Sequence, residues 1–198
     1  MSFTDQYIQE KSLEIYNAIK DRKVIYLDLK YWIMIRDCNP TVEDIASQIS
    51  IKITELYQSG KCIFPISEPI LLEILKQDDA VSRNATLKLV ERLSEGVAII
   101  GDRQRIKTEF SQWVLSGQNP SHPSHTQKLV WSSTALVLGY FFYAEKAEEL
   151  PLKLRRLFLD FVCGFPISEL LDNPATTFIP FKGKDDVAAL NKDGLKMR

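Results

Sequence analysis

The fold of this chain is decided by the stretch Val24-Ile25-Tyr26-Leu27-Asp28-Leu29-Lys30-Tyr31-Trp32-Ile33-Met34-Ile35. Its uninterrupted apolar residues are typical of a strand that is buried on both faces of a parallel sheet, and we place that strand near 24–30. An ionised aspartate at the end of such a strand is costly to desolvate unless a metal, a cation or several donors compensate it. Because ligands collect at the carboxyl ends of strands in open α/β sheets, Asp28 is the strongest functional candidate among the acidic residues.

The first half of the sequence alternates between helix-like and strand-like segments. Isoleucines lie at helical spacing before the first strand, and Thr41 is a plausible N-cap for a second helix. Further strands are expected near 61–66 and 97–100. Ser67-Glu68-Pro69, which separates them, is typical of a helix start. The resulting order, αβαβααβ, predicts an α/β domain with a small parallel sheet.

The second half is expected to be mainly helical. Its predicted elements are a helix after Asp102, helices over 126–149 and 151–163, and a weak strand over 177–180. We therefore expect an α/β core over 1–115, a loop over 116–125, and a helical extension with a polar tail over 126–198. The extension is expected to pack on the same domain.

Composition excludes several classes of protein. The 198 residues are 45% hydrophobic and 26% charged, which is typical of a globular domain, and the net charge of −1 gives no global attraction to nucleic acid. Cys38, Cys62 and Cys163 are widely spaced, so we expect free thiols in a reducing compartment. The segment over 135–144 is too short to cross a bilayer, and the first residues do not resemble a signal peptide. We expect a cytoplasmic protein without membrane contact.

Asp28 and Glu73 form the main candidate site. Right-handed crossovers place consecutive parallel strands side by side, so these two carboxylates are expected to converge at one edge of the sheet. Converging carboxylates suit Mg²⁺ or Mn²⁺, and such an ion activates water for attack on a phosphodiester. The alternative is that Asp28 is a helix cap or pairs with a cation, while Glu73 is a solvated helix residue.

Part of the chain resembles the PIN-like nucleases. The resemblance covers roughly 24–109 and rests on Asp28-Leu29-Lys30-Tyr31-Trp32, Phe64-Pro65-Ile66-Ser67, Leu72-Glu73, Arg83 and the segment over 90–96. It implies a Rossmann-like, three-layer PIN-type domain that cleaves RNA with Mg²⁺ or Mn²⁺, as toxins, defence components and RNA-processing enzymes do. It also implies that Asp28 and Glu73 are the catalytic, metal-binding carboxylates.

Two departures from the family pattern keep a second hypothesis open. Lys30 stands where family members often have asparagine, and the late acidic segment that completes the family's site is not found. Under this second hypothesis, the chain is a catalytically incomplete PIN-like binding module, or a subunit that needs an antitoxin, a second subunit or a second copy of itself. A phosphotransferase of the haloacid-dehalogenase type is disfavoured, because Lys30 occupies the position of its second aspartate.

The remaining candidates are secondary. Asp102 and Glu109 are possible further metal ligands, with a helix cap and a surface acid as the alternatives. Basic side chains that are expected to contact RNA phosphates, with solvated or structural positions as the alternative, are Lys30, Arg83, Arg155 and Arg156.

Overall fold

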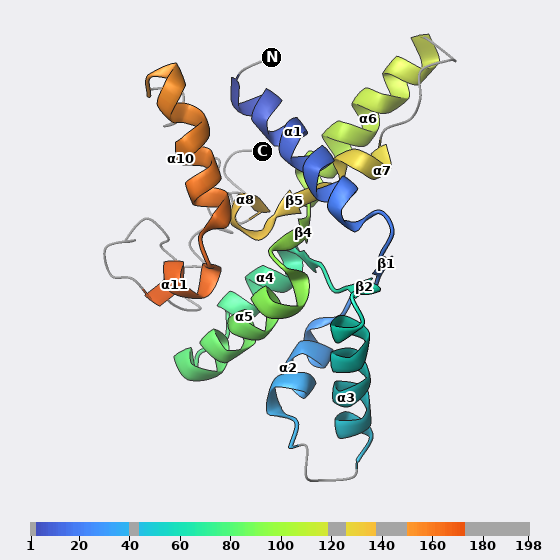
Figure 1. Ribbon diagram of the computed structural model, residues 1–198, viewed down its shortest axis with the longest axis vertical. Coiled ribbons are helices and arrows are strands. Elements are labelled where there is room, and N and C mark those ends of the chain that lie inside the picture. The colour runs from blue at the N-terminus through green and yellow to red at the C-terminus, as the bar shows by residue number, and fades with distance from the viewer. Residues whose placement is uncertain (1–2, 40–43, 119–125, 138–149, 173–198) are drawn as a thin grey trace, which may run out of the picture.

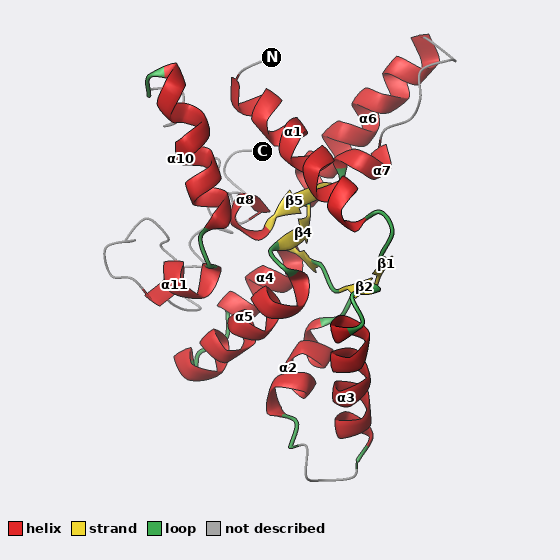
Figure 2. Ribbon diagram, viewed as in Figure 1, coloured by secondary structure: helices red, strands yellow, loops and turns green. Residues whose placement is uncertain are grey.

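Short strands lie at the centre of the structure and helices extend from them (Figures 1 and 2). The computed structural model describes residues 3–39, 44–118, 126–137 and 150–172. Its elements are α1 (Phe3–Ile19), β1 (Lys23–Val24), α2 (Leu29–Asp37), α3 (Ile45–Gln58), β2 (Cys62–Ile63), β3 (Ile66–Ser67), α4 (Glu68–Leu75), α5 (Ala80–Ser94), β4 (Val97–Ile99), α6 (Asp102–Gln118), α7 (Thr126–Leu129), β5 (Trp131–Ser133), α8 (Thr134–Val137), α10 (Leu152–Gly164) and α11 (Ile167–Asp172). The expected strand over 177–180 and the polar tail lie outside the described residues.

The strands form two small ladders. β1 pairs in parallel with β2, while β3 pairs in parallel with β4, and β5 adds an antiparallel strand to β4. The segment Phe64-Pro65 separates β2 from β3, and proline has no N–H to donate to a ladder. The α/β class, the parallel pairing and the strand near 97–100 agree with the sequence prediction. The single strand expected near 61–66 is wrong, because Phe64-Pro65 divides it into β2 and β3, which belong to different ladders.

The first strand is shorter than predicted, so its expected extent over 24–30 is wrong. β1 ends at Val24, and Ile25 still donates its N–H to the Ile63 carbonyl at 2.9 Å, but helix α2 begins at Leu29. The apolar run does not alternate as a half-buried strand would, and such a run does not by itself distinguish a strand from a buried helix. Trp32 and Ile35 are both buried and lie three residues apart, on one face of a helix. Their packing therefore favours a helix over a strand.

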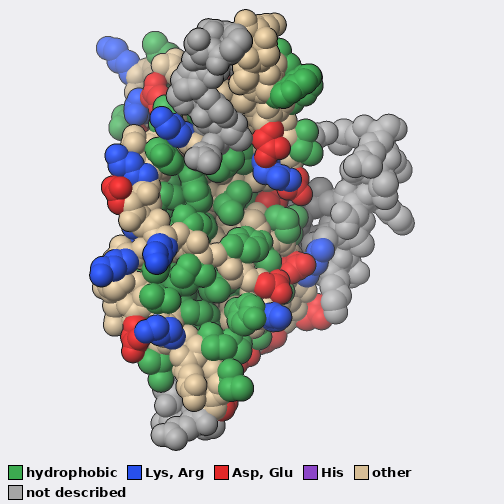
Figure 3. All heavy atoms as spheres, turned by 90° about the vertical axis from the view of Figure 1, so that its right-hand side faces the viewer, with side chains coloured by type: hydrophobic (Ala, Val, Ile, Leu, Met, Phe, Trp, Pro, Cys, Tyr) green, Lys and Arg blue, Asp and Glu red, His purple; other side chains and the backbone are tan. Residues whose placement is uncertain are grey.

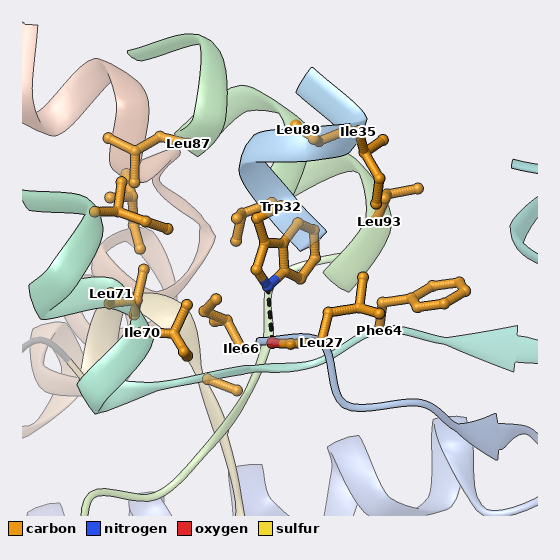
Figure 4. Packing of buried hydrophobic residues seen from close by; sticks show 14 of the residues in the cluster. Leu27, Trp32, Ile35, Phe64, Ile66, Ile70, Leu71, Leu87, Leu89 and Leu93 are labelled. Atoms are coloured by element: carbon orange, nitrogen blue, oxygen red, sulfur yellow. Dashed lines mark hydrogen bonds between the residues drawn. The ribbon is translucent and has the colours of Figure 1, made fainter. Parts of the chain in front are cut away.

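One hydrophobic core holds α2, α4 and α5 against the strands (Figure 4). Trp32 is fully buried in it together with Phe64 and Leu71. The indole Nε1 donates a hydrogen bond of 3.1 Å to the Leu27 carbonyl, so this large side chain is buried without an unpaired polar atom.

The expected continuous helix over 126–149 is wrong in its first part. It is interrupted by β5, and Thr134 donates its N–H to the Gly96 carbonyl at 2.9 Å. Ladder pairing with β4 outweighs the local helical pattern here. The described part of this region ends at Val137. The prediction over 151–163 agrees with α10.

Local capping explains several helix ends. Asp44 caps α3 through the Ser47 N–H at 2.7 Å, whereas the expected cap, Thr41, lies outside the described residues.

Cys38, Cys62 and Cys163 are free thiols, as predicted. Among the described helices, none combines the length and the apolar character needed to span a membrane.

Candidate functional site

Asp28 lies where the chain leaves β1 and enters α2. Its backbone is extended and its Oδ1 accepts a hydrogen bond of 2.8 Å from the Leu29 N–H, so Asp28 is the N-cap of α2. The structural alternative raised for Asp28 is therefore correct as far as the cap is concerned. The side chain is exposed, and within the described residues Oδ2 has no hydrogen bond and the carboxylate has no ion pair.

A side-chain hydrogen bond ties the carboxyl ends of two strand segments together. The hydroxyls of Tyr26 and Ser67 lie 2.7 Å apart, and Ser67 is the last residue of β3. Ser67 precedes α4 as its N-cap residue but makes no side-chain cap bond. This link holds the segment that ends in Asp28 beside the start of α4.

Glu73 lies on the outer side of α4. The helix buries Ile70, Leu71, Ile74 and Leu75, and the Glu73 side chain is exposed between them along the sequence. Helices α2 and α4 contact each other through the core. The convergence of the carboxylates of Asp28 and Glu73 stays a prediction.

Asp102 and Glu109 lie on α6 and share a cation. Arg105 lies 3.3 Å from Asp102 and 3.6 Å from Glu109, with all three side chains well exposed. In the part of the chain that the structure describes, no group of three or more potential metal-ligating side chains comes together. The expected role of Asp102 and Glu109 as further ligands thus has no geometric support.

Glu68 is an acidic residue that its sequence pattern does not single out, because Ser67-Glu68-Pro69 is typical of a helix start. In the structure it follows β3 directly and is the first residue of α4. Its carboxylate lies where a Cβ of residue 101 would be, so the glycine at that position makes room for it. Burial, and to a lesser extent the negative charge of Asp102, raise the pKa of Glu68 above its usual value.

Glu68 and Gly101 border a cleft of about 570 Å³ between α1 and α6. Both helices lie in the upper part of Figure 1. The other lining residues are Asp5, Ile8, Gln9, Ser12, Gln104, Lys107, Thr108, Ser111, Gln112, Leu129 and Val137. The cleft is therefore mixed in character, with amides and hydroxyls beside a few aliphatic side chains.

Three of the four predicted phosphate-contacting residues have internal partners. Arg83 donates to the Gln77 carbonyl at 2.8 Å, Arg155 donates to the Leu150 carbonyl at 2.9 Å, and Arg156 pairs with Glu10 at 2.9 Å. Lys30 differs from them. Its side chain is exposed two residues after Asp28, with its ammonium group 4.9 Å from the centre of the Tyr31 ring.

Comparison of the chain with protein-family models, with curated proteins and with solved structures found no match. The resemblance to PIN-like nucleases therefore rests on the quoted sequence motifs.

Proposed function

We propose that this chain is a metal-dependent endoribonuclease of the PIN-like type, with Asp28 and Glu73 as its catalytic carboxylates. The observation that supports this most is the position of Asp28 in the connection that follows the parallel strand β1, four residues past its last residue, exposed and with one carboxylate oxygen unpaired among the described contacts. Such strand ends are where α/β proteins bind their ligands.

The two carboxylates have the chemistry that a hard divalent cation requires. Mg²⁺ typically takes one or two carboxylates and keeps several waters, and both Asp28 and Glu73 are exposed enough for that. When bound, the ion supplies an activated water and neutralises charge on the phosphodiester. Asp28 presents Oδ2 while the Leu29 N–H holds Oδ1, and Lys30 offers an exposed ammonium group for an RNA phosphate.

RNA cleavage with Mn²⁺ or Mg²⁺ tests the assignment. Asp28→Asn and Glu73→Gln should each lower the rate by about 100-fold or more, the order of magnitude that catalytic side chains contribute. Asparagine is as good an N-cap as aspartate, so the first variant removes the charge while it keeps the start of α2. Asp21→Asn, a change of an exposed aspartate in the turn before β1, is the matched control and should cleave like the wild type.

Two results would contradict the assignment. One is cleavage that persists unchanged in both carboxylate variants, which would place the chemistry elsewhere or in a contaminant. The other is a wild-type protein without activity on single-stranded and structured RNA in either metal.

A second candidate function is that of a subunit that acts only with a partner chain. Two exposed apolar helix faces favour it: α6 presents Ile106, Phe110 and Trp113, and α10 presents Leu154, Leu157 and Phe161. Figure 3 shows the side of the molecule that lies on the right in Figure 1, where hydrophobic side chains are exposed among charged ones, whereas α10 lies on the other side. Light scattering of the purified chain should then show a stable oligomer, or activity should appear only with a co-purified partner. A monomer that cleaves RNA alone would exclude this function.

A further inference from the structure

Glu68 is the half-buried acid of the cleft between α1 and α6. It makes no hydrogen bond and no ion pair with any described residue, although its carboxylate is packed against Gly101. The negative charge of Asp102 acts on Glu68 and repels it. An acid that is partly removed from water without a compensating partner costs free energy, so a cation beside Glu68 would be favourable.

The rest of the cleft is built for a molecule larger than a metal ion. Its volume of about 570 Å³ lies in the range of small-molecule sites. A metal with six waters needs much less, since each water occupies about 30 Å³. Gln9 and Gln104 offer amides and Thr108 a hydroxyl along the sides, and Val137 and Leu129 offer aliphatic surface.

We propose that this cleft binds a small organic cation, with a protonated amine or guanidine group paired with Glu68. The aliphatic part of the ligand lies along Leu129 and Val137, and the amides of Gln9 and Gln104 bind its polar groups. Asp5 adds a second acidic residue to the lining, against Lys107 as the basic one. This site is separate from the proposed catalytic carboxylates and does not depend on nuclease activity.

Calorimetric titration of the full chain tests the proposal with agmatine, which carries one amine and one guanidine on a four-carbon chain. Agmatine should bind, and 1,4-butanediol, with the same carbon chain and no charge, should bind at least tenfold more weakly. Equal affinities for the two compounds would overturn the proposal, and so would absence of binding by both agmatine and spermidine at millimolar concentration. Displacement of agmatine by low concentrations of Mg²⁺ would also overturn it, because the cleft would then be a metal site.

Variants locate the site. Glu68→Gln should weaken agmatine binding by at least tenfold, whereas Glu169→Gln, the same change at an exposed position on α11, should leave it unchanged. Gly101→Ala should also weaken binding, because the new methyl group displaces the Glu68 carboxylate. Ser111→Phe should block the cleft without a change in its charge. Wild-type affinity in both Glu68→Gln and Ser111→Phe would disprove the assignment, with circular dichroism used to confirm that each variant is folded.

Discussion

At the scale of single residues, Trp32 connects the core to the candidate catalytic segment. Its indole is fully buried in the core that α2, α4 and α5 share, and its Nε1 donates to the carbonyl of Leu27, the residue before Asp28 (Figure 4). A buried carbonyl that loses its donor costs free energy in addition to the lost packing. The same side chain therefore stabilises the domain and fixes the backbone from which Asp28 starts the helix.

Trp32→Phe should lower the free energy of unfolding by about 2–4 kcal/mol, because it removes both volume and the hydrogen bond. Urea denaturation followed by circular dichroism measures this. Trp113→Phe, on the exposed face of α6, is the control and should stay within about 0.5 kcal/mol of the wild type. Equal effects of the two changes would mean that Trp32 is not the central core residue.

Glu68 gives a prediction on pH dependence. Its pKa is raised in the folded state, so the folded chain keeps this proton to higher pH than the unfolded chain does. The wild type therefore loses stability as pH rises through the folded-state pKa of Glu68, and that loss should be absent in Glu68→Gln. At pH 7 the variant should be more stable by no more than about 1 kcal/mol, because solvent screens a half-buried group.

The measurement is the difference in unfolding free energy between the two proteins from pH 3 to pH 8. Asp102, Asp5 and Lys107 are the charged residues near Glu68, but all three are common to both proteins. A difference that stays constant with pH would contradict the perturbed carboxyl group.

At the scale of elements, α11 depends on a residue from another helix. Glu91 of α5 accepts hydrogen bonds from the N–H and the hydroxyl of Ser168, at 2.7 and 2.8 Å, in the first turn of α11. Glu91 thereby accepts a hydrogen bond from a backbone N–H in the first turn of α11. The residue before this helix, Pro166, has no side chain that could do so. This interaction connects α5 of the first half of the chain to the last described helix.

Glu91→Ala should destabilise the protein by about 1–2 kcal/mol and speed hydrogen exchange at the Ser168 amide. Glu55→Ala removes an exposed acid that pairs only with Lys52 in its own helix, and it should have almost no effect. Unchanged exchange at α11 in the first variant would show that the cap is dispensable.

The elements also show what the sequence could and could not reveal. The strand near 97–100 was predictable because a short apolar run after a glycine marks it locally, whereas the division of the stretch 61–66 into β2 and β3 depends on their pairing with different strands. The helix at Leu29 was missed, since its apolar face follows a strand-like run and only packing of Trp32 decides between the two. The strand β5 forms because it pairs with β4, and the Glu68 carboxylate occupies space that Gly101 leaves open. Both of these partners are distant in sequence, so the local pattern does not reveal them.

At the scale of the whole molecule, α10 packs against α1, although the two helices are far apart in sequence. The Tyr7 hydroxyl donates to Asp160 at 2.8 Å and also contacts the thiol of Cys163, while Glu10 pairs with Arg156. Burial, followed by Cys163 and Asp160, raises the pKa of Tyr7 well above that of a free tyrosine. The buried hydroxyl of Tyr7 therefore joins α1 to α10.

Tyr7→Phe should cost about 1–2 kcal/mol at neutral pH through the lost hydrogen bond. The native state keeps the Tyr7 proton while the unfolded chain loses it near pH 10, so the wild type should lose stability steeply above that pH. The variant should lack this loss, and Tyr31→Phe should retain it. Identical alkaline unfolding curves for the wild type and Tyr7→Phe would rule out the buried phenol as the cause.

The break at Phe64-Pro65 has a consequence for cooperativity. Because β2 and β3 pair with different neighbours, no continuous ladder transmits strain between the β1–β2 pair and the β3–β4–β5 sheet. The two ladders are joined by side chains instead: Ile63 of β2 packs in one cluster with Val97 of β4, and Tyr26 is hydrogen-bonded to Ser67 of β3. Asp28 follows the smaller ladder and Glu68 follows the larger one, so cooperative opening of the two sites depends on this packing and not on backbone hydrogen bonds.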